Sequence, residues 1–225
     1  KDVAICRKQG DLPLNVSIEN LEKSRKQNIE PRLWMTDETI STDSWSYTKD
    51  MELKKPKDLI DVLIDVVSKN GVLLLNVSPM ADGTIPVEQK DILLSIGKWL
   101  KVNGEAIYET RPWYVFGEGP TVQPEGDFKN HKEFLKIKYS WKDVRYTTKD
   151  NNVYAIVLGT PGCGLINLVF KGFSKKSWKK PMRIKNVSVL GSNQRIDWEE
   201  TPDGLAVVTP VLEGDMAVCF KIECE

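Results

Sequence analysis

A single histidine, His131, stands among the 225 residues of the chain, whereas 32 residues are acidic. One imidazole argues against a metal site built from several histidines, and it leaves a Ser-His-Asp triad only one candidate base. We therefore expect carboxylates to carry out any proton transfer near neutral pH. We expect neither a metal ion nor an organic cofactor.

The 32 basic residues balance the 32 acidic ones, and no stripe of Lys and Arg stands out. This balance gives no electrostatic signature of nucleic-acid binding. The longest apolar runs, at residues 59–67 and 71–76, are shorter than the roughly 18–20 residues that a membrane span needs. The chain begins without a Met or a signal-peptide core. We expect no nucleic-acid or membrane partner, and we expect the chain to be part of a larger protein.

The first half of the chain alternates strand-like and helix-like segments. Residues 3–6 are typical of a short buried strand, and residues 17–27 of a short helix or a loop. A helix is predicted over residues 56–69, because Pro suits a first turn and Asn70-Gly71 suits a helix end.

A continuous apolar run at residues 72–76 follows this helix at once, which predicts a parallel strand covered on both faces. A second helix is expected to start at Pro86 and to end at Gly104. This rhythm is typical of the βα units of an α/β barrel or a doubly wound sheet. In a barrel, active sites lie at the carboxyl ends of the strands.

The second half of the chain differs in character. Glycines and prolines cluster at residues 117–126, which indicates a linker or a surface loop. Short alternating runs separated by turn signals follow, at residues 134–139, 144–148, 153–158, 165–170, 184–190, 205–208 and 216–222. Seven short strands in about a hundred residues predict an antiparallel β-sandwich.

An ordered set of motifs in the first half resembles the α-L-fucosidases of glycoside hydrolase family 29. The segments Trp34–Ile40 and Ser44–Tyr47 are similar to the family's, although Ser46 replaces the Gly of the common Ser-Trp-Gly-Tyr. The strongest matches are DVVSKNGVLLLNVSP at 65–79, DGTIP at 82–86, GKWL at 97–100, NGEAIY at 103–108 and TRPW at 110–113. The second half resembles the family only in kind.

The resemblance implies the C-terminal part of a catalytic (β/α)8-like barrel at residues 1–115. A C-terminal β-sandwich domain would follow at residues 116–225. The family's catalytic domain starts far upstream of the segments matched here, so we expect the chain to be a C-terminal fragment.

The resemblance also implies a retaining exo-α-L-fucosidase, which removes terminal α-L-fucose from glycans by double displacement between two carboxylates. The family's nucleophilic Asp lies in a Trp-Phe-Asp-like motif that has no counterpart in this sequence. We therefore expect the chain alone to be inactive. The alternatives are a non-catalytic glycan-binding or structural module and a degenerate family member.

Glu22 is the candidate acid/base, because the family's acid/base lies about a dozen positions before the segment that begins at Trp34. It would need a raised pKa from burial or a nearby carboxylate. Otherwise Glu22 is a surface residue paired with Lys26. Asp37 is the runner-up, since it could sit at the carboxyl end of a strand. The remaining rivals are Glu19, Glu30 and Glu38.

Arg7 and Trp45 are the candidate substrate-binding residues that the resemblance implies. The guanidinium of Arg7 would bind sugar hydroxyls at a strand end, unless it is simply solvated beside Lys8. Trp45 would line the fucose pocket, since an aromatic wall suits the apolar face and methyl group of fucose. We expect Trp34 to pack in the core instead.

The remaining expectations concern partners and location. The resemblance implies fucosylated glycans or glycoconjugates as partners, with oligomers possible through the parent protein. It implies a secreted, periplasmic or lysosomal protein. Four cysteines without a CxxC pair leave the question of disulfides open.

Overall fold

The computed structural model describes residues 3–8, 10–124, 131–160, 162, 166–174, 183–209 and 214–225. The chain forms two compact units. We call the first, Lys1–Gly97 with Val122–Ile137, the α/β unit. The second, Lys98–Thr121 with Lys138–Glu225, is the β unit. The domain boundary between residues 115 and 116 stays a prediction.

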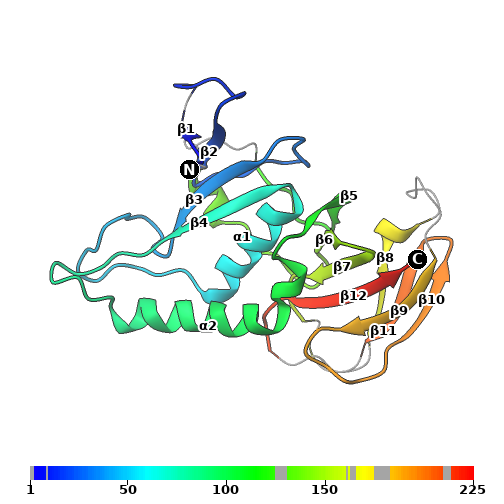
Figure 1. The fold of residues 1–225 in the computed structure, drawn as a ribbon. Helices are drawn as coiled ribbons and strands as arrows, with labels where there is room; N and C mark the ends of the chain where they lie inside the picture. Colours follow the sequence, from blue (N-terminus) through cyan, green and yellow to red (C-terminus); the bar gives the residue numbers. More distant parts are fainter. Residues whose placement is uncertain are drawn as a thin grey trace. The chain divides into compact units, whose positions relative to one another are not determined.

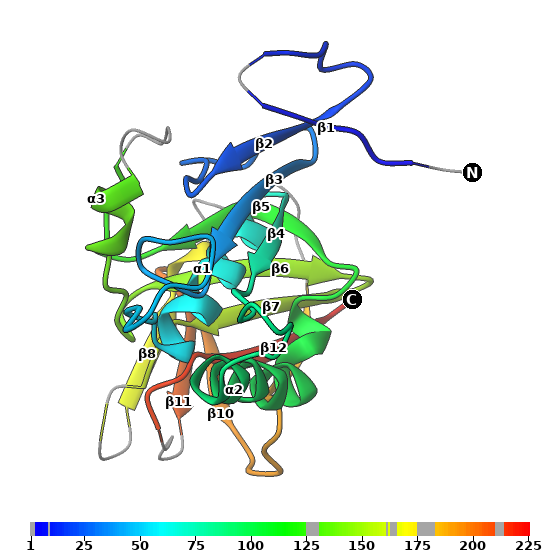
Figure 2. The same cartoon turned by 90° about the vertical axis from the view of Figure 1, so that its left-hand side faces the viewer.

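The α/β unit contains a parallel sheet whose four strands keep their sequence order, β1-β2-β3-β4 (Figure 1 and Figure 2). Helix α1 connects β3 to β4, and α2 follows β4. The bounds are β1 (Cys6–Arg7), β2 (Ile18–Glu22), β3 (Trp34–Thr39), α1 (Pro56–Ser68), β4 (Gly71–Asn76) and α2 (Val87–Asn103). The residues of α2 from Lys98 onward, and the 3-10 turn η1 (Gly104–Ala106) that follows, belong to the β unit. Parallel neighbours joined by helices form the wall of a (β/α) barrel.

The indole of Trp34 packs between the sheet and α1. It clusters with Val62 and Val66 of the helix and is almost fully buried, as predicted. Its Nε1 donates to the backbone oxygen of Lys69 at 2.9 Å. Gly71 faces the same indole, and a Cβ at this position would lie 2.6 Å from it. The first residue of β4 must therefore be glycine for β3 and α1 to approach so closely.

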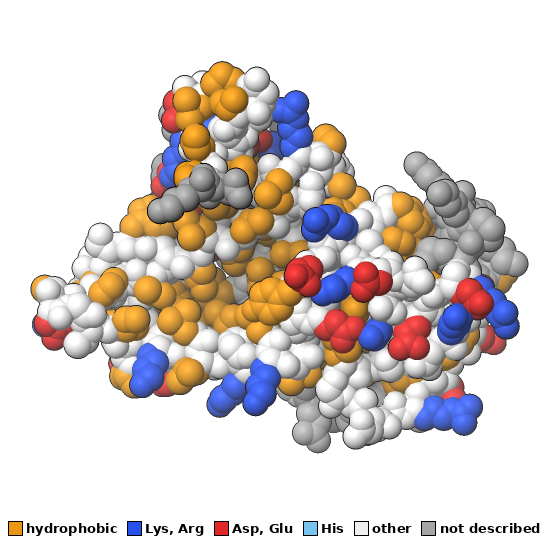
Figure 3. Space-filling model, in the orientation of Figure 1, with side chains coloured by type: hydrophobic (Ala, Val, Ile, Leu, Met, Phe, Trp, Pro, Cys, Tyr) orange, Lys and Arg blue, Asp and Glu red, His pale blue; other side chains and the backbone are white. Residues whose placement is uncertain are grey.

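On β4, the other face of the sheet is apolar but uncovered among the described residues. Leu73 and Leu75 of β4 pack toward the helices, whereas Val72 and Leu74 are exposed. Figure 3 shows hydrophobic side chains around β3 and β4. The predicted strand is present and parallel, but only one of its faces is covered in the described part of the chain.

The β unit is an antiparallel sandwich, as predicted. Its sheets have the orders β5-β6-β7-β12-β9 and β10-β11-β8. The core between them includes Tyr146, Phe170, Leu205 and Phe220. The bounds are β5 (Arg111–Glu118), β6 (Val144–Lys149), β7 (Asn152–Val157), β8 (Ile166–Phe170), η3 (Lys171–Phe173), β9 (Ile184–Val189), β10 (Asp197–Thr201), β11 (Gly204–Thr209) and β12 (Val218–Cys224).

Three sequence-based expectations were wrong. Residues 3–6 do not form a buried strand, because β1 covers only Cys6–Arg7 and all four residues are exposed. Residues 17–27 contain strand β2, where a short helix or a loop was expected. Residues 134 and 135, the start of an expected strand, belong to helix α3 (His131–Leu135). Strands β5 and β10 were not expected. β10 lacks an apolar alternation because Trp198 is its single apolar residue, so its place in the sheet depends on pairing with β11.

Two further observations concern the described residues only. No helix among them is long and apolar enough to cross a membrane. The thiols of Cys6, Cys219 and Cys224 are free, and burial raises the pKa of Cys224 to about 11. Cys163 lies outside the described residues.

Candidate active site

Glu22 and Asp37 lie side by side at the carboxyl edge of the parallel sheet. Glu22 is the last residue of β2, and its register partner on β3 is Asp37. Because the strands are parallel, both side chains point to the same face at the same height. The structure thus brings together the candidate acid/base and its runner-up.

The ammonium group of Lys8 joins the two carboxylates. Its Nζ lies 3.1 Å from Glu22 Oε2 and 3.0 Å from Asp37 Oδ2. Partial burial lowers the pKa of Lys8, but the hydrogen bonds to Asp37 and Glu22 outweigh this and raise it overall. Lys8 is therefore a cation throughout the neutral range. The suggested pairing of Glu22 with Lys26 is wrong, because Lys26 binds Glu19 at 2.8 Å.

Asn20 completes this group from the same face of β2, two residues before Glu22. Its Nδ2 donates to Asp37 Oδ2 at 3.3 Å. Two acceptors in the group, Asn20 Oδ1 and Asp37 Oδ1, are buried without a hydrogen-bond partner. Unsatisfied acceptors at a strand edge are suited to the hydroxyl groups of a sugar. The sequence analysis missed Asn20 and Lys8, although the i, i+2 spacing from Glu22 could have indicated Asn20.

Arg7 of β1 is occupied by protein groups. Its Nη1 donates to the Leu12 oxygen at 2.8 Å, and its Nη2 lies 3.7 Å from Glu19 Oε1. Only Nε is buried without a partner. The substrate-binding role of Arg7 stays a prediction.

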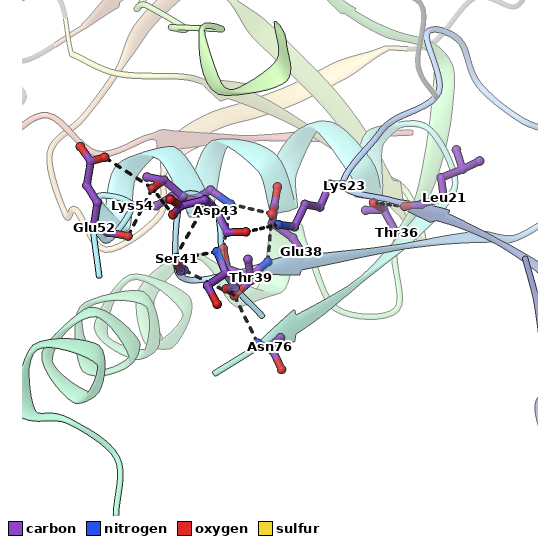
Figure 4. A network of polar contacts seen from close by, with 12 residues as sticks. Leu21, Lys23, Thr36, Glu38, Thr39, Ser41, Asp43, Glu52, Lys54 and Asn76 are labelled. Carbon is purple, nitrogen blue, oxygen red and sulfur yellow. Dashed lines mark hydrogen bonds and ion pairs between the residues drawn. The ribbon is translucent and has the colours of Figure 1, made fainter. Parts of the chain in front are cut away.

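Trp45 is half-buried in the loop after β3, and side chains at the end of β4 and just after it bind its backbone. Its oxygen accepts hydrogen bonds from Asn76 Nδ2 at 2.9 Å and from Ser78 Oγ at 3.0 Å. Asn76 also donates to Thr39 Oγ1 at 3.2 Å (Figure 4). The Lys23 ammonium, one residue after Glu22, lies 4.6 Å from the centre of a Trp45 ring. This contact places Trp45 next to the chain segment that carries Glu22.

Two of the other rivals for the acid/base, Glu38 and Glu19, are engaged elsewhere. Glu38 alternates to the opposite face from Asp37 and binds Lys54 Nζ at 2.6 Å in a buried ion pair (Figure 4). Glu19 binds Arg7 and Lys26. Among the described residues, no group of three or more His, Cys, Asp or Glu side chains could hold a metal ion.

Comparison with known proteins bears on this arrangement. The family model "Alpha-L-fucosidase" matches residues 5–105, and the model "Alpha-L-fucosidase C-terminal domain" matches residues 139–223. The tissue alpha-L-fucosidase of Mus musculus is 33% identical over 195 residues, which are 85% of this chain and 37% of the mouse protein. The chain belongs to the α-L-fucosidase family.

Other α-L-fucosidases agree with this membership. The plasma alpha-L-fucosidase of Homo sapiens is 34% identical over 188 residues, 81% of this chain and 34% of that protein. The chain thus spans little more than a third of the length of these relatives. An α-fucosidase of Thermotoga maritima, solved in complex with fucose, superposes with a TM-score of 0.70 at 23% identity, covering 96% of this chain and 44% of that one. This likeness shows the fold: part of a (β/α)8-like barrel followed by a β-sandwich.

Proposed function

We propose that the protein containing this chain is a retaining exo-α-L-fucosidase, and that Glu22 is its acid/base. The observation that carries the proposal is the placement of Glu22 beside Asp37 at the carboxyl edge of a parallel sheet in an α-L-fucosidase family member. Active sites of barrels are built at this edge. Fucosylated glycans or glycoconjugates are the proposed substrates, by analogy with relatives named α-L-fucosidases.

In this proposal Glu22 protonates the glycosidic oxygen and later removes a proton from the attacking water. The ammonium of Lys8 contacts both Glu22 and Asp37 and holds the two carboxylates in place. The buried acceptors Asn20 Oδ1 and Asp37 Oδ1 take hydrogen bonds from sugar hydroxyls. Trp45 covers the apolar face of the fucose ring.

The nucleophile is proposed to come from outside this chain. A retaining mechanism needs a second carboxylate about 5–5.5 Å from the acid/base, on the other side of the scissile bond. Asp37 is an unsuitable nucleophile in this account, because it shares the ammonium of Lys8 with Glu22. The Trp-Phe-Asp-like motif of the family is absent from the 225 residues.

Stereochemistry of the product tests the proposal. The protein at its full length would be mixed with an aryl α-L-fucoside, and the first anomer of fucose released would be followed by proton NMR. Retention predicts α-L-fucose before mutarotation. Release of β-L-fucose would contradict the mechanism, and binding of fucose without any release would favour the alternative, a glycan-binding module. A secreted, periplasmic or lysosomal location is proposed, since the relatives include plasma and tissue fucosidases.

A further inference from the structure

Three consecutive polar residues directly after Glu22 are buried. Lys23 and Arg25 are each only 6% exposed, and Ser24 between them is 1% exposed. Lys23 adopts a positive φ of 49°, an uncommon conformation for a residue with a side chain. Charged side chains are almost never buried to this degree unless they are paired. This segment therefore needs a physical explanation.

Neither cation has an anionic partner among the described residues. Lys23 Nζ donates a long hydrogen bond, 3.4 Å, to the backbone oxygen of Asp43, and it lies 4.6 Å from the centre of a Trp45 ring. The Arg25 guanidinium stacks 5.1 Å from the ring centre of Phe134 in α3. The hydroxyl of Ser24 is buried without any hydrogen-bond partner. The segment thus carries three hydrogen-bond donors that have few acceptors among the described residues.

A third buried cation lies close to them. Lys54 Nζ binds Glu38 Oε1 at 2.6 Å and the Thr39 oxygen at 2.8 Å (Figure 4). Burial lowers the pKa of Lys54, Glu38 raises it, and the charges of Lys23 and Arg25 lower it further. The three cations therefore repel one another, and Glu38 neutralises only one of them. Among the residues that the structure describes, the charges of Lys23 and Arg25 have no anion to compensate them.

We propose that Lys23, Ser24 and Arg25 bind a small oxyanion, with Lys54 behind them. Arg25 can donate two parallel hydrogen bonds to a carboxylate or sulfate, and Lys23 and Ser24 can donate one each. A bound oxyanion would neutralise the excess charge and would give the Ser24 hydroxyl an acceptor.

The position of the group indicates where the oxyanion comes from. It begins one residue after Glu22 and shares the Trp45 ring through Lys23. The oxyanion is then a sulfate ester or a carboxylate carried by the glycan beside the fucosyl bond. This step, unlike the existence of the site, rests on the proposed function. The site would select acidic fucosylated glycans over neutral ones.

Inorganic sulfate is the first probe. Isothermal calorimetry and thermal unfolding of the protein at its full length would compare sodium sulfate with sodium chloride at equal ionic strength. We expect sulfate to bind and to raise Tm. Arg25→Met should lose this response and, without sulfate, should unfold at a higher temperature than the wild type, because it removes an uncompensated buried charge. Arg32→Met, an exposed arginine in the same unit, is the matched control and should respond as the wild type does.

Equal sulfate responses in the wild type and Arg25→Met would overturn the proposal, as would a wild type that responds equally to both salts. A lower Tm or failed folding of Arg25→Met without sulfate would also contradict it, because Arg25 would then have a partner in the protein itself. Lys23→Met gives an independent reading, since its stem can still pack on Trp45. It should weaken sulfate binding at least tenfold.

Substrate selectivity then distinguishes the two sources of the oxyanion. Three fucosides that differ only in a sulfate, a carboxylate or a hydroxyl on the leaving group would be compared by kcat/KM. The preferred acidic substrate should exceed the neutral one at least tenfold, and Arg25→Met should reduce this ratio to near one. An unchanged ratio would overturn the substrate assignment alone. No turnover of any fucoside would count against the proposed function, and the sulfate measurements would still decide on the site.

Discussion

Glu22 and Asp37 are register partners on adjacent parallel strands, and the ammonium of Lys8 contacts both carboxylates within 3.1 Å. Two carboxylates and one cation carry a single net negative charge when all three are ionised. The ammonium therefore offsets the repulsion between the two carboxylates and keeps them side by side at the carboxyl edge of the sheet.

The close contact between Gly71 and Trp34 predicts that a change to alanine has opposite effects on stability at Gly71 and at Gly97. A Cβ on Gly71 would lie 2.6 Å from the Trp34 ring and 2.7 Å from Val66, so Gly71→Ala should destabilise the α/β unit by about 1–3 kcal/mol. Gly97 lies in α2 with nothing within 4 Å of its Cβ position. Gly97→Ala should therefore stabilise the helix, by about 0.5–1 kcal/mol. Urea unfolding of both variants measures the contrast, and equal effects would contradict it.

The ion pair between Lys69 and Asp65 is fully buried and joins α1 to Gln123. Lys69 Nζ lies 2.9 Å from Asp65 Oδ2 and donates to Gln123 Oε1 at 2.8 Å. Lys69→Met leaves the Asp65 charge buried and should cost about 3–5 kcal/mol in urea unfolding. Lys136 pairs with Glu133 on the surface of the same unit. Lys136→Met should lower the free energy of unfolding by less than about 1 kcal/mol. Similar losses in the two variants would contradict the prediction, because the Lys69 pair would then be as exposed to water as the Lys136 pair.

Glu118 gives the β unit a pH dependence of its own. Burial raises the pKa of Glu118, and hydrogen bonds from the backbone amides of Lys171 and Gly172, both at 3.0 Å, offset this in part. The folded state therefore binds the proton more tightly than the unfolded state. The stability contributed by the protonated group is present below the ordinary pKa of about 4.5 and is lost as the pH rises through the raised value.

Glu118→Gln should remove this contribution from the pH profile. The difference in Tm between the variant and the wild type would be followed from about pH 4 to about pH 7, a range that begins near the ordinary carboxyl pKa. We expect the variant to gain relative to the wild type as the pH rises. A difference that does not vary with pH would contradict the raised pKa.

Local sequence patterns predicted the elements whose side chains face a core. The helix after Pro56 and the strand before Asn76 have apolar residues that pack against each other, so their periodicity is visible without the fold. Strand β2 lacks this signal because the face carrying Asn20 and Glu22 points to the candidate site rather than to a core. A strand whose side chains form the candidate site therefore lacks the apolar alternation from which strands are predicted.

The candidate site was predicted in part. Glu22 was singled out by resemblance and Asp37 by its place near the end of an expected strand. Their adjacency depends on the register of two strands separated by eleven residues of loop, which no local pattern specifies. The same is true of Lys8, which reaches both carboxylates from the end of β1. Helix α3 was missed because only Phe134 of its described side chains is buried, against Arg25.

The dependence of turnover on the leaving group tests the central claim most directly. Glu22→Gln and Glu19→Gln would be compared in the protein at its full length, on aryl α-L-fucosides with good and poor leaving groups. Glu22→Gln should lose about 10²–10⁴-fold in kcat/KM on the poor leaving group and much less on the good one, because only the former needs a proton. Glu19→Gln should stay near wild type on both. Equal losses of Glu22→Gln on the two substrates, or no loss, would contradict the assignment of Glu22 as the acid/base.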